Sequence, residues 1–173
     1  SDVDTGELLH INEGALYQAK IIGIQKGSSG SPGEISGMIH YDAQQVIGSI
    51  DKNCDQGIFG TLNIVPKPLS LNKQELETGP ATVLCGIDGE VKEFDAEITR
   101  IDMNHEDSNK SFVIQVTDQE LLDMTGGIVQ GMSGSPVIQN GKFAGAITHV
   151  FVQDAAGGYG IFAETMIENV EKE

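Results

Sequence analysis

Short apolar runs rich in Ile, Val, Thr and Phe, each bounded by Gly, Pro, Asn or Asp, recur along almost the whole chain. Runs of this length and composition are typical of β-strands. We predict strands near residues 15–24, 34–40, 45–51 and 57–65, and a second series near residues 81–86, 90–103, 111–117, 135–139, 142–151 and 158–163. Asn140-Gly141 lies between two of these strands and favours the type I′ turn of a hairpin. The pattern therefore predicts an all-β protein.

Helical periodicity is confined to two short segments. Residues 118–124 form the first. Residues 164–172 form the second, in which Met166, Ile167 and Val170 share one face. The chain is therefore expected to end in a short helix.

A polar stretch separates the two series of strands. It begins with Pro66-Lys67-Pro68 and ends at Gly79-Pro80. Because proline has no backbone N–H to donate, such a segment does not fit inside a sheet. We therefore divide the chain into a first half over residues 1–65, a linker over residues 66–80 and a second half over residues 81–173.

The charge of the chain narrows the choice of partners. Its 173 residues carry a formal net charge of −16. This charge repels phosphate backbones and anionic lipid head groups, so no nucleic-acid partner is expected. The longest apolar runs fall far short of the roughly 18 residues that a membrane-spanning helix needs. Two cysteines, Cys54 and Cys85, allow either one disulfide or two buried thiols.

The segment Gly131-Met132-Ser133-Gly134-Ser135-Pro136 carries the most informative chemistry. A serine between glycines at a tight turn exposes its hydroxyl, and the neighbouring backbone N–H groups can point at one spot. Acyl transfer needs both, a nucleophile and donors for the developing oxyanion. We therefore interpret Ser133 as a nucleophile and the N–H groups of Gly131 and Ser133 as oxyanion donors. The alternative is a glycine-rich turn that joins two strands and has no chemical role.

The order of elements after this turn resembles the second barrel of chymotrypsin-like serine peptidases. The turn itself is similar to the trypsin-type Gly-Asp-Ser-Gly-Gly-Pro, with Met132 in place of Asp and Ser135 in place of Gly. A longer resemblance is to the SpoIVB peptidase family. Three segments carry it, namely residues 125–136, residues 26–34 and Gly57-Ile58-Phe59-Gly60.

This resemblance implies a fold and a function. The fold is a chymotrypsin-like double β-barrel in which the first barrel is incomplete. The implied function is that of a serine endopeptidase of sporulation signalling, secreted into the space between the forespore and mother-cell membranes. There it cleaves a membrane-bound regulatory protein, so that an intramembrane protease activates the late mother-cell sigma factor. No metal or cofactor is expected, and the membrane is reached only through an N-terminal region that precedes this chain.

The resemblance also implies the catalytic residues. The family nucleophile falls on Ser133 and the family aspartate on Asp118, with Asp102 and Asp123 as alternatives. Asp118 can instead be read as the N-cap of the helix at residues 119–124. The family histidine is expected upstream of Ser1, together with two strands of the first barrel, a PDZ domain and a membrane anchor.

The four histidines of this chain are judged separately. His149 and Thr148 lie in the strand that lines the substrate pocket of chymotrypsin-like folds, although His149 can equally be structural. His10 and His40 precede Asp118 and Ser133 in the expected order, but their surroundings do not match the family motif. His105 is predicted to lie in a polar hairpin loop.

Three further interpretations remain. Ser28-Ser29-Gly30-Ser31-Pro32 is similar to the nucleophile segment, but we interpret it as a barrel turn. A chain that lacks its base can be a non-enzymatic module that only binds peptide. A hydrolase that uses Cys85 as nucleophile is a third possibility, and it predicts sensitivity to thiol alkylation.

Overall fold

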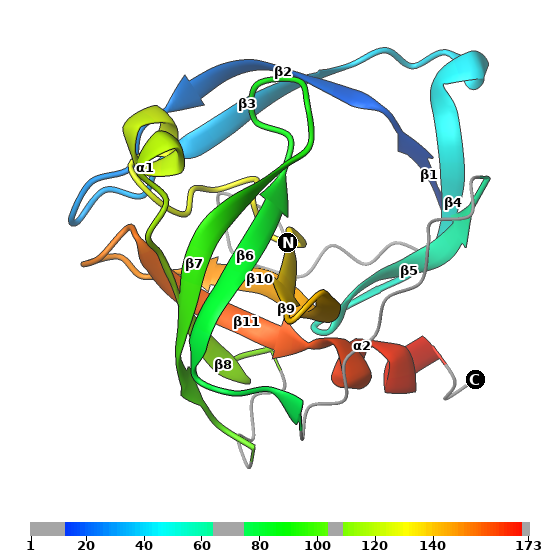
Figure 1. The fold of residues 1–173 in the computed structure, drawn as a ribbon. Coiled ribbons are helices and arrows are strands. Elements are labelled where there is room, and N and C mark those ends of the chain that lie inside the picture. Colours follow the sequence, from blue (N-terminus) through cyan, green and yellow to red (C-terminus); the bar gives the residue numbers. More distant parts are fainter. Residues whose placement is uncertain (1–12, 64–74, 104–108, 171–173) are drawn as a thin grey trace.

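The second half of the chain closes into a six-stranded antiparallel barrel. The computed structural model describes residues 13–63, 75–103 and 109–170. The barrel is formed by β6 (Gly79–Cys85), β7 (Lys92–Ile101), β8 (Phe112–Val116), β9 (Pro136–Gln139), β10 (Lys142–Val150) and β11 (Gly157–Phe162). Its strands follow the order β10-β11-β8-β7-β6-β9 around the closed barrel (Figure 1). The second barrel predicted from the sequence is therefore confirmed.

The interior of this barrel is the hydrophobic core. Along β7, Phe94, Ala96 and Ile98 are buried while the residues between them are exposed, because successive side chains of a strand point to opposite faces. Strands β8 and β11 lie close together in the core. A Cβ atom at Gly160 of β11 would collide with the ring of Phe112 in β8. Glycine at this position therefore leaves the room that the Phe112 ring occupies.

The described part of the first half forms two small sheets. One contains β1 (Gly14–Tyr17), β4 (Val46–Cys54) and β5 (Gly57–Leu62) in the order β1-β4-β5, and the other pairs β2 (Ala19–Gln25) with β3 (Glu34–Ile39). A short 3₁₀ helix, η1 (Ala43–Gln45), precedes β4. Among the described residues these sheets do not close, which agrees with the expected incomplete first barrel. The strand predicted over residues 15–24 is interrupted at Gln18, because β1 and β2 belong to different sheets.

Strand β6 begins inside the segment predicted to be a linker. Its first two residues are Gly79 and Pro80, whereas we expected the strand from residue 81. Pro80 is tolerated because it lies at the start of the strand, where only β7 pairs with it; β9 pairs with β6 at Thr82 and Val83. Residues 64–74, which include most of that segment, lie outside the described residues.

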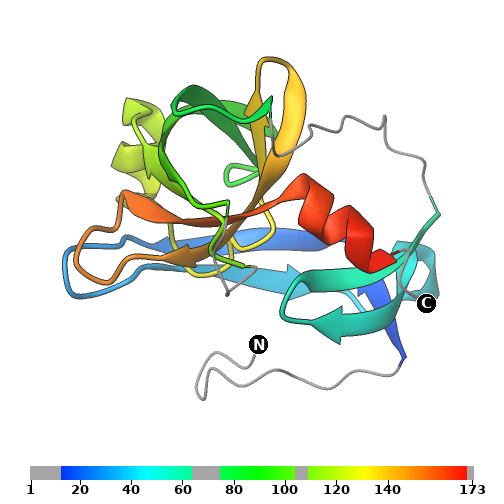
Figure 2. The ribbon, with the colours of Figure 1, turned by 90° about the horizontal axis from the view of Figure 1, so that it is seen from below.

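Two short helices complete the fold. α1 (Gln119–Thr125) begins after Asp118 and ends at Gly126, which has the left-handed conformation of a helix C-cap. α2 (Ala163–Val170) follows β11 directly and lies beside the β4–β5 hairpin (Figure 2). Both helices were predicted. In the part of the chain that the structure describes, no helix is long and apolar enough to cross a membrane.

The first half is attached to the second by backbone hydrogen bonds. The Ile35 N–H donates to the Gln130 carbonyl at 2.8 Å, and the Gln130 N–H donates to the Gly33 carbonyl at 2.8 Å. The Gly27 N–H donates to the Thr125 carbonyl at 2.8 Å. These bonds hold the β2–β3 hairpin against the segment that leads from α1 to Ser133.

We expect the barrel core to dominate stability. Ile98 has no exposed surface, so Ile98→Ala should lower the free energy of unfolding by about 2–5 kcal/mol, because it removes buried methyl groups and leaves a cavity. Ile22→Ala, the same change at a side chain that is 58% exposed, should cost less than about 1 kcal/mol. Urea unfolding of both variants measures the difference. Equal losses would contradict the assignment of the core.

Candidate active site

The turn at residues 131–135 presents Ser133 to solvent. Gly131 has φ 101°, a conformation that favours glycine, and a Cβ atom there would lie 3.1 Å from the Cβ atom of Ile35. Met132 is buried and anchors the turn, while the side chain of Ser133 is exposed. Two backbone hydrogen bonds hold the turn in place. The Gly134 N–H donates to the Ile147 carbonyl at 2.8 Å, and the Ser135 N–H donates to the Met132 carbonyl at 2.9 Å. The sequence thus builds a fixed loop with one projecting hydroxyl.

Ser133 lies at a cavity of about 550 Å³ together with both residues predicted to form the substrate pocket. Its Oγ donates a hydrogen bond to the backbone carbonyl of Thr148 at 3.0 Å. Thr148 and His149 both line the cavity, and the Thr148 hydroxyl donates to the Asn109 carbonyl at 2.6 Å. The structure therefore brings Ser133, Thr148 and His149 together in one cavity.

The backbone N–H groups of Gly131 and Ser133 are available as donors. The N–H groups of Met132, Gly134 and Ser135 are all used within the fold. Within the described part of the chain, those of Gly131 and Ser133 have no acceptor. Two free donors on either side of one residue are what an oxyanion hole requires. The prediction of these two groups as oxyanion donors fits this arrangement.

A second cavity, of about 430 Å³, lies along the same turn. It is mostly apolar, and its lining includes Gly131, Met132 and Cys85. Burial raises the pKa of the Cys85 thiol to about 11, and the charges of Asp88 and Asp118 add to this shift. A thiol with such a pKa keeps its proton at neutral pH, so Cys85 is a poor nucleophile. The third interpretation, a hydrolase that uses Cys85, therefore finds no support here.

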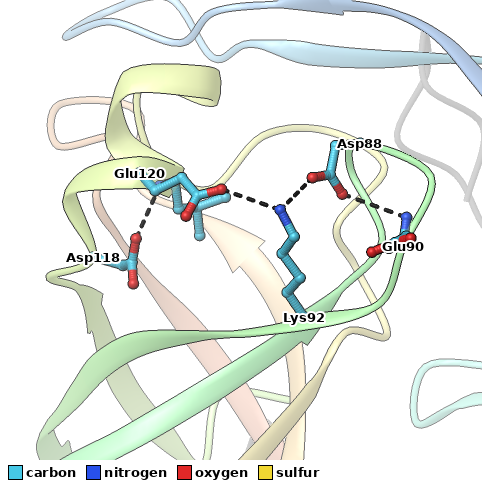
Figure 3. A network of polar contacts seen from close by, with 6 residues as sticks. Asp88, Glu90, Lys92, Asp118 and Glu120 are labelled. Atoms are coloured by element: carbon cyan, nitrogen blue, oxygen red, sulfur yellow. Dashed lines mark hydrogen bonds and ion pairs between the residues drawn. The ribbon is translucent and has the colours of Figure 1, made fainter.

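Asp118 caps the N-terminus of α1. Its Oδ1 accepts from the Leu121 N–H at 3.1 Å, and its Oδ2 accepts from the Asp95 N–H at 3.2 Å. Figure 3 shows Asp118 at the start of the helix, beside the ion pairs that Lys92 makes with Asp88 and Glu120. Asp118 does not line the cavity that contains Ser133. The capping role is thus visible in the structure, and the catalytic role of Asp118 stays a prediction.

The alternative aspartates also lie away from this cavity. Asp123 accepts a hydrogen bond from the Gln119 Nε2 at 2.9 Å within α1. The Asp102 N–H donates to the Ser111 carbonyl just after β7. Neither residue lines the cavity of Ser133.

One histidine of the described chain lies at the cavity. It is His149, whose side chain is exposed. His40 is exposed just after β3 and does not line the cavity. His10 and His105 lie outside the described residues. Over residues 13–63, 75–103 and 109–170, no group of three or more His, Cys, Asp or Glu side chains could hold a metal ion.

One carboxylate at the cavity was not predicted from the sequence. Asp55, in the turn between β4 and β5, lines the same cavity as Ser133. The available signal was its position, because Asp55 lies just before the segment Gly57–Gly60 that carries part of the family resemblance. Strand periodicity alone gave no reason to connect a hairpin turn in the first half with a serine in the second.

A closed antiparallel barrel with an exposed serine on a glycine-rich turn defines the class of chymotrypsin-like serine peptidases. The pattern of one family, the SpoIVB peptidase S55 family, matches residues 1–167. The chain therefore belongs to the SpoIVB peptidase family and is a serine peptidase of that family.

Solved structures of one protease share this fold. The active form of the Rv3671c protease from M. tuberculosis is 17% identical, with a TM-score of 0.54, and the match covers 86% of this chain and 67% of that one. An inactive form of the same protease is 17% identical, with a TM-score of 0.53, and the match covers 92% of this chain and 86% of that one. An inactive serine-to-alanine mutant of it is 18% identical, with a TM-score of 0.51, covering 82% and 69% of the two chains. No curated protein matches the chain significantly.

The thiol of Cys85 should make stability fall at alkaline pH. An unperturbed thiol loses its proton near pH 9.0, whereas the folded protein holds this proton until about pH 11. The folded state therefore binds more protons than the unfolded state in this window, and the free energy of unfolding decreases as the pH rises through it. Urea unfolding of the wild type and of Cys85→Ala at several pH values measures the contribution.

The matched control is Cys54→Ala. This variant should keep the alkaline decrease, whereas Cys85→Ala should show a shallower one. Identical pH profiles for the two variants would show that Cys85 does not titrate as stated.

Proposed function

We propose that this chain is the catalytic part of an endopeptidase in which Ser133 is the nucleophile. The observation that carries the proposal is the exposed Ser133 hydroxyl at a cavity, on a turn whose Gly131 and Ser133 N–H groups are free. In the reaction, Oγ forms a bond to the scissile carbonyl carbon while a base takes its proton. The oxygen that gains negative charge accepts from the two N–H groups, and the base then gives the proton to the leaving amine.

The base in this proposal is a histidine upstream of Ser1, as the family resemblance implies. The substrate is a membrane-bound regulatory protein of sporulation signalling, cleaved in the space between the forespore and mother-cell membranes. Membership of the SpoIVB peptidase family supports this part of the proposal.

A peptide-binding module without catalytic activity is the second candidate. It is favoured by one observation, namely that the Ser133 hydroxyl donates its hydrogen bond to the backbone carbonyl of Thr148 and not to an imidazole. A binding module would hold peptide in the cavity without reacting with it. The two candidates therefore differ in whether Ser133 can be acylated.

Ser133→Ala should abolish activity in the full-length protein. Cleavage of a peptide library should disappear, and a fluorophosphonate probe that reacts with activated serines should no longer label the protein, because the attacking oxygen is absent. Mass spectrometry of the labelled wild type should place the probe on Ser133.

The matched control for this test is Ser29→Ala. Ser29 holds the position of Ser133 in the similar Ser-Gly-Ser-Pro segment of the first half, and its exposed side chain donates to the Gln153 carbonyl at 2.9 Å. This variant should be labelled at the wild-type rate. A wild-type protein that binds peptides but is never labelled would favour the binding module instead.

The net charge of −16 should make cleavage depend on salt. A lysine-rich peptide is attracted to the acidic protein, and dissolved ions screen this attraction. We expect kcat/KM for a lysine-rich peptide to fall as the ionic strength rises, whereas kcat/KM for an uncharged peptide of the same length should change little. A parallel fall for both peptides would point to an effect of salt on the enzyme itself.

A further inference from the structure

The nucleophile turn lies between two cavities. Gly134 lines both of them, the first cavity of about 550 Å³ and the second cavity of about 430 Å³. On the side of the first cavity, the Gly134 N–H donates to the Ile147 carbonyl of β10. On the side of the second cavity, Gly131 packs against Ile35 of β3. A peptide that lies across Ser133 therefore has one cavity on each side of its scissile bond.

Apolar side chains from both halves of the chain line the second cavity. Ile21 and Ile35 come from β2 and β3, and Ile87 and Val91 come from the β6–β7 hairpin. The described residues that line it include none with a charged side chain, although the whole chain carries a net charge of −16. Val91 is 75% exposed, so this wall is open to a ligand from solution. Such a cavity favours an apolar group over a charged one.

The β6–β7 hairpin holds Ile87 and Val91 at this cavity. Lys92, the first residue of β7, forms an ion pair with Asp88 in the turn of the hairpin. It forms a second ion pair with Glu120 of α1 at 3.2 Å (Figure 3). These contacts tie the turn to the helix beside it. The wall of the cavity is therefore formed before a ligand binds, which reduces the cost of ordering it.

The substrate itself is the occupant that this position favours. Sites for small ligands measure about 300–1,000 Å³, so a cavity of about 430 Å³ has room for a large apolar side chain such as Leu, Met or Phe. An extended peptide advances about 3.3 Å per residue, and its successive side chains point to opposite sides. Of the two residues next to the scissile bond on one side, one therefore points toward the second cavity.

We propose that the second cavity is a subsite for an apolar side chain on the amine side of the scissile bond, and that Val91 determines its specificity. The inference rests on the proposed function. The pocket predicted at Thr148 and His149 takes the acyl side, which leaves the second cavity for one of the two residues that follow the cut. The amine half departs when the acyl–enzyme forms, so the subsite acts on acylation.

The test measures kcat/KM of the full-length protein with a peptide that it cuts once. Each of the two residues after the cut is replaced in turn by Leu and by Ser. At one of these positions the Leu peptide should have a kcat/KM at least about tenfold higher, because each methylene group in an apolar pocket contributes about that factor. Val91→Asp should remove most of this preference and raise the relative kcat/KM of a Lys peptide, because it places a carboxylate at the cavity.

The matched control is Val152→Asp, which adds the same charge elsewhere. Val152 is 54% exposed just after β10 and lines neither cavity. Its kcat/KM should stay within about threefold of the wild type for every peptide. A second variant, Ile21→Thr, tests the opposite wall of the cavity and keeps a β-branched side chain in β2. It should also reduce the preference for Leu.

Fluorophosphonate labelling separates a subsite from a structural effect. The probe reacts with Ser133 and carries no peptide on the amine side. Val91→Asp should therefore be labelled within about threefold of the wild-type rate. Loss of labelling in this variant would overturn the inference, because Val91 would then support the nucleophile turn and not the substrate.

The remaining outcomes distinguish this inference from the proposed function. A wild-type protein that is never labelled would overturn both. A labelled wild type that cleaves the Leu and Ser peptides equally would overturn the subsite alone, and so would a Val91→Asp variant that keeps the wild-type preference. A Val91→Asp variant whose preference changes only before the cut would assign the cavity to the acyl side, which also contradicts the inference.

Discussion

The site depends on the backbone hydrogen bonds that join the β2–β3 hairpin to Gln130. They lie immediately before Gly131, whose left-handed conformation turns the chain toward Ser133. Ile35 packs so close to Gly131 that a side chain there would have to displace it. The contact between the two halves therefore sets the shape of the nucleophile turn, and the turn cannot be treated as a property of the second barrel alone.

The closed barrel supplies the rigidity that this turn needs. Ser133 projects from a loop whose neighbours are buried or bonded to β10, so the hydroxyl is fixed while its own surroundings stay open to solvent. In many enzymes a packed sheet is the rigid scaffold, and short loops on it carry the exposed reactive groups. The turn at Ser133 follows this arrangement. The cavity itself is shared, because its walls come from β10, from α2 and from the hairpin of the first half.

Two aspartates illustrate how surroundings decide a role. Asp118 lies just before a helix, where free backbone N–H groups attract a carboxylate, and both of its oxygens are engaged there. Asp55 lies in a hairpin turn, where the fold leaves its carboxylate facing a cavity without a described cation. The carboxylate of Asp118 thus caps a helix, whereas the carboxylate of Asp55 belongs to a residue that lines the cavity of Ser133. The family resemblance implies Asp118 as the catalytic aspartate, and the structure shows its capping role at the start of α1.

The sequence by itself determined the secondary structure and the nucleophile turn. Short apolar runs bounded by turn residues, the Asn140-Gly141 turn and the glycines around Ser133 are local signals, so the strands and the exposed serine followed from them. The two helices followed from helical periodicity, which is also local. The sequence also offered the N-cap interpretation of Asp118, because capping is decided within a few residues. Only the tertiary structure decided which residues share the cavity of Ser133. Cys54, Asp55 and Met166 come from distant parts of the chain, and their meeting depends on strand pairing and on the contact between hairpin and helix, which no local pattern encodes.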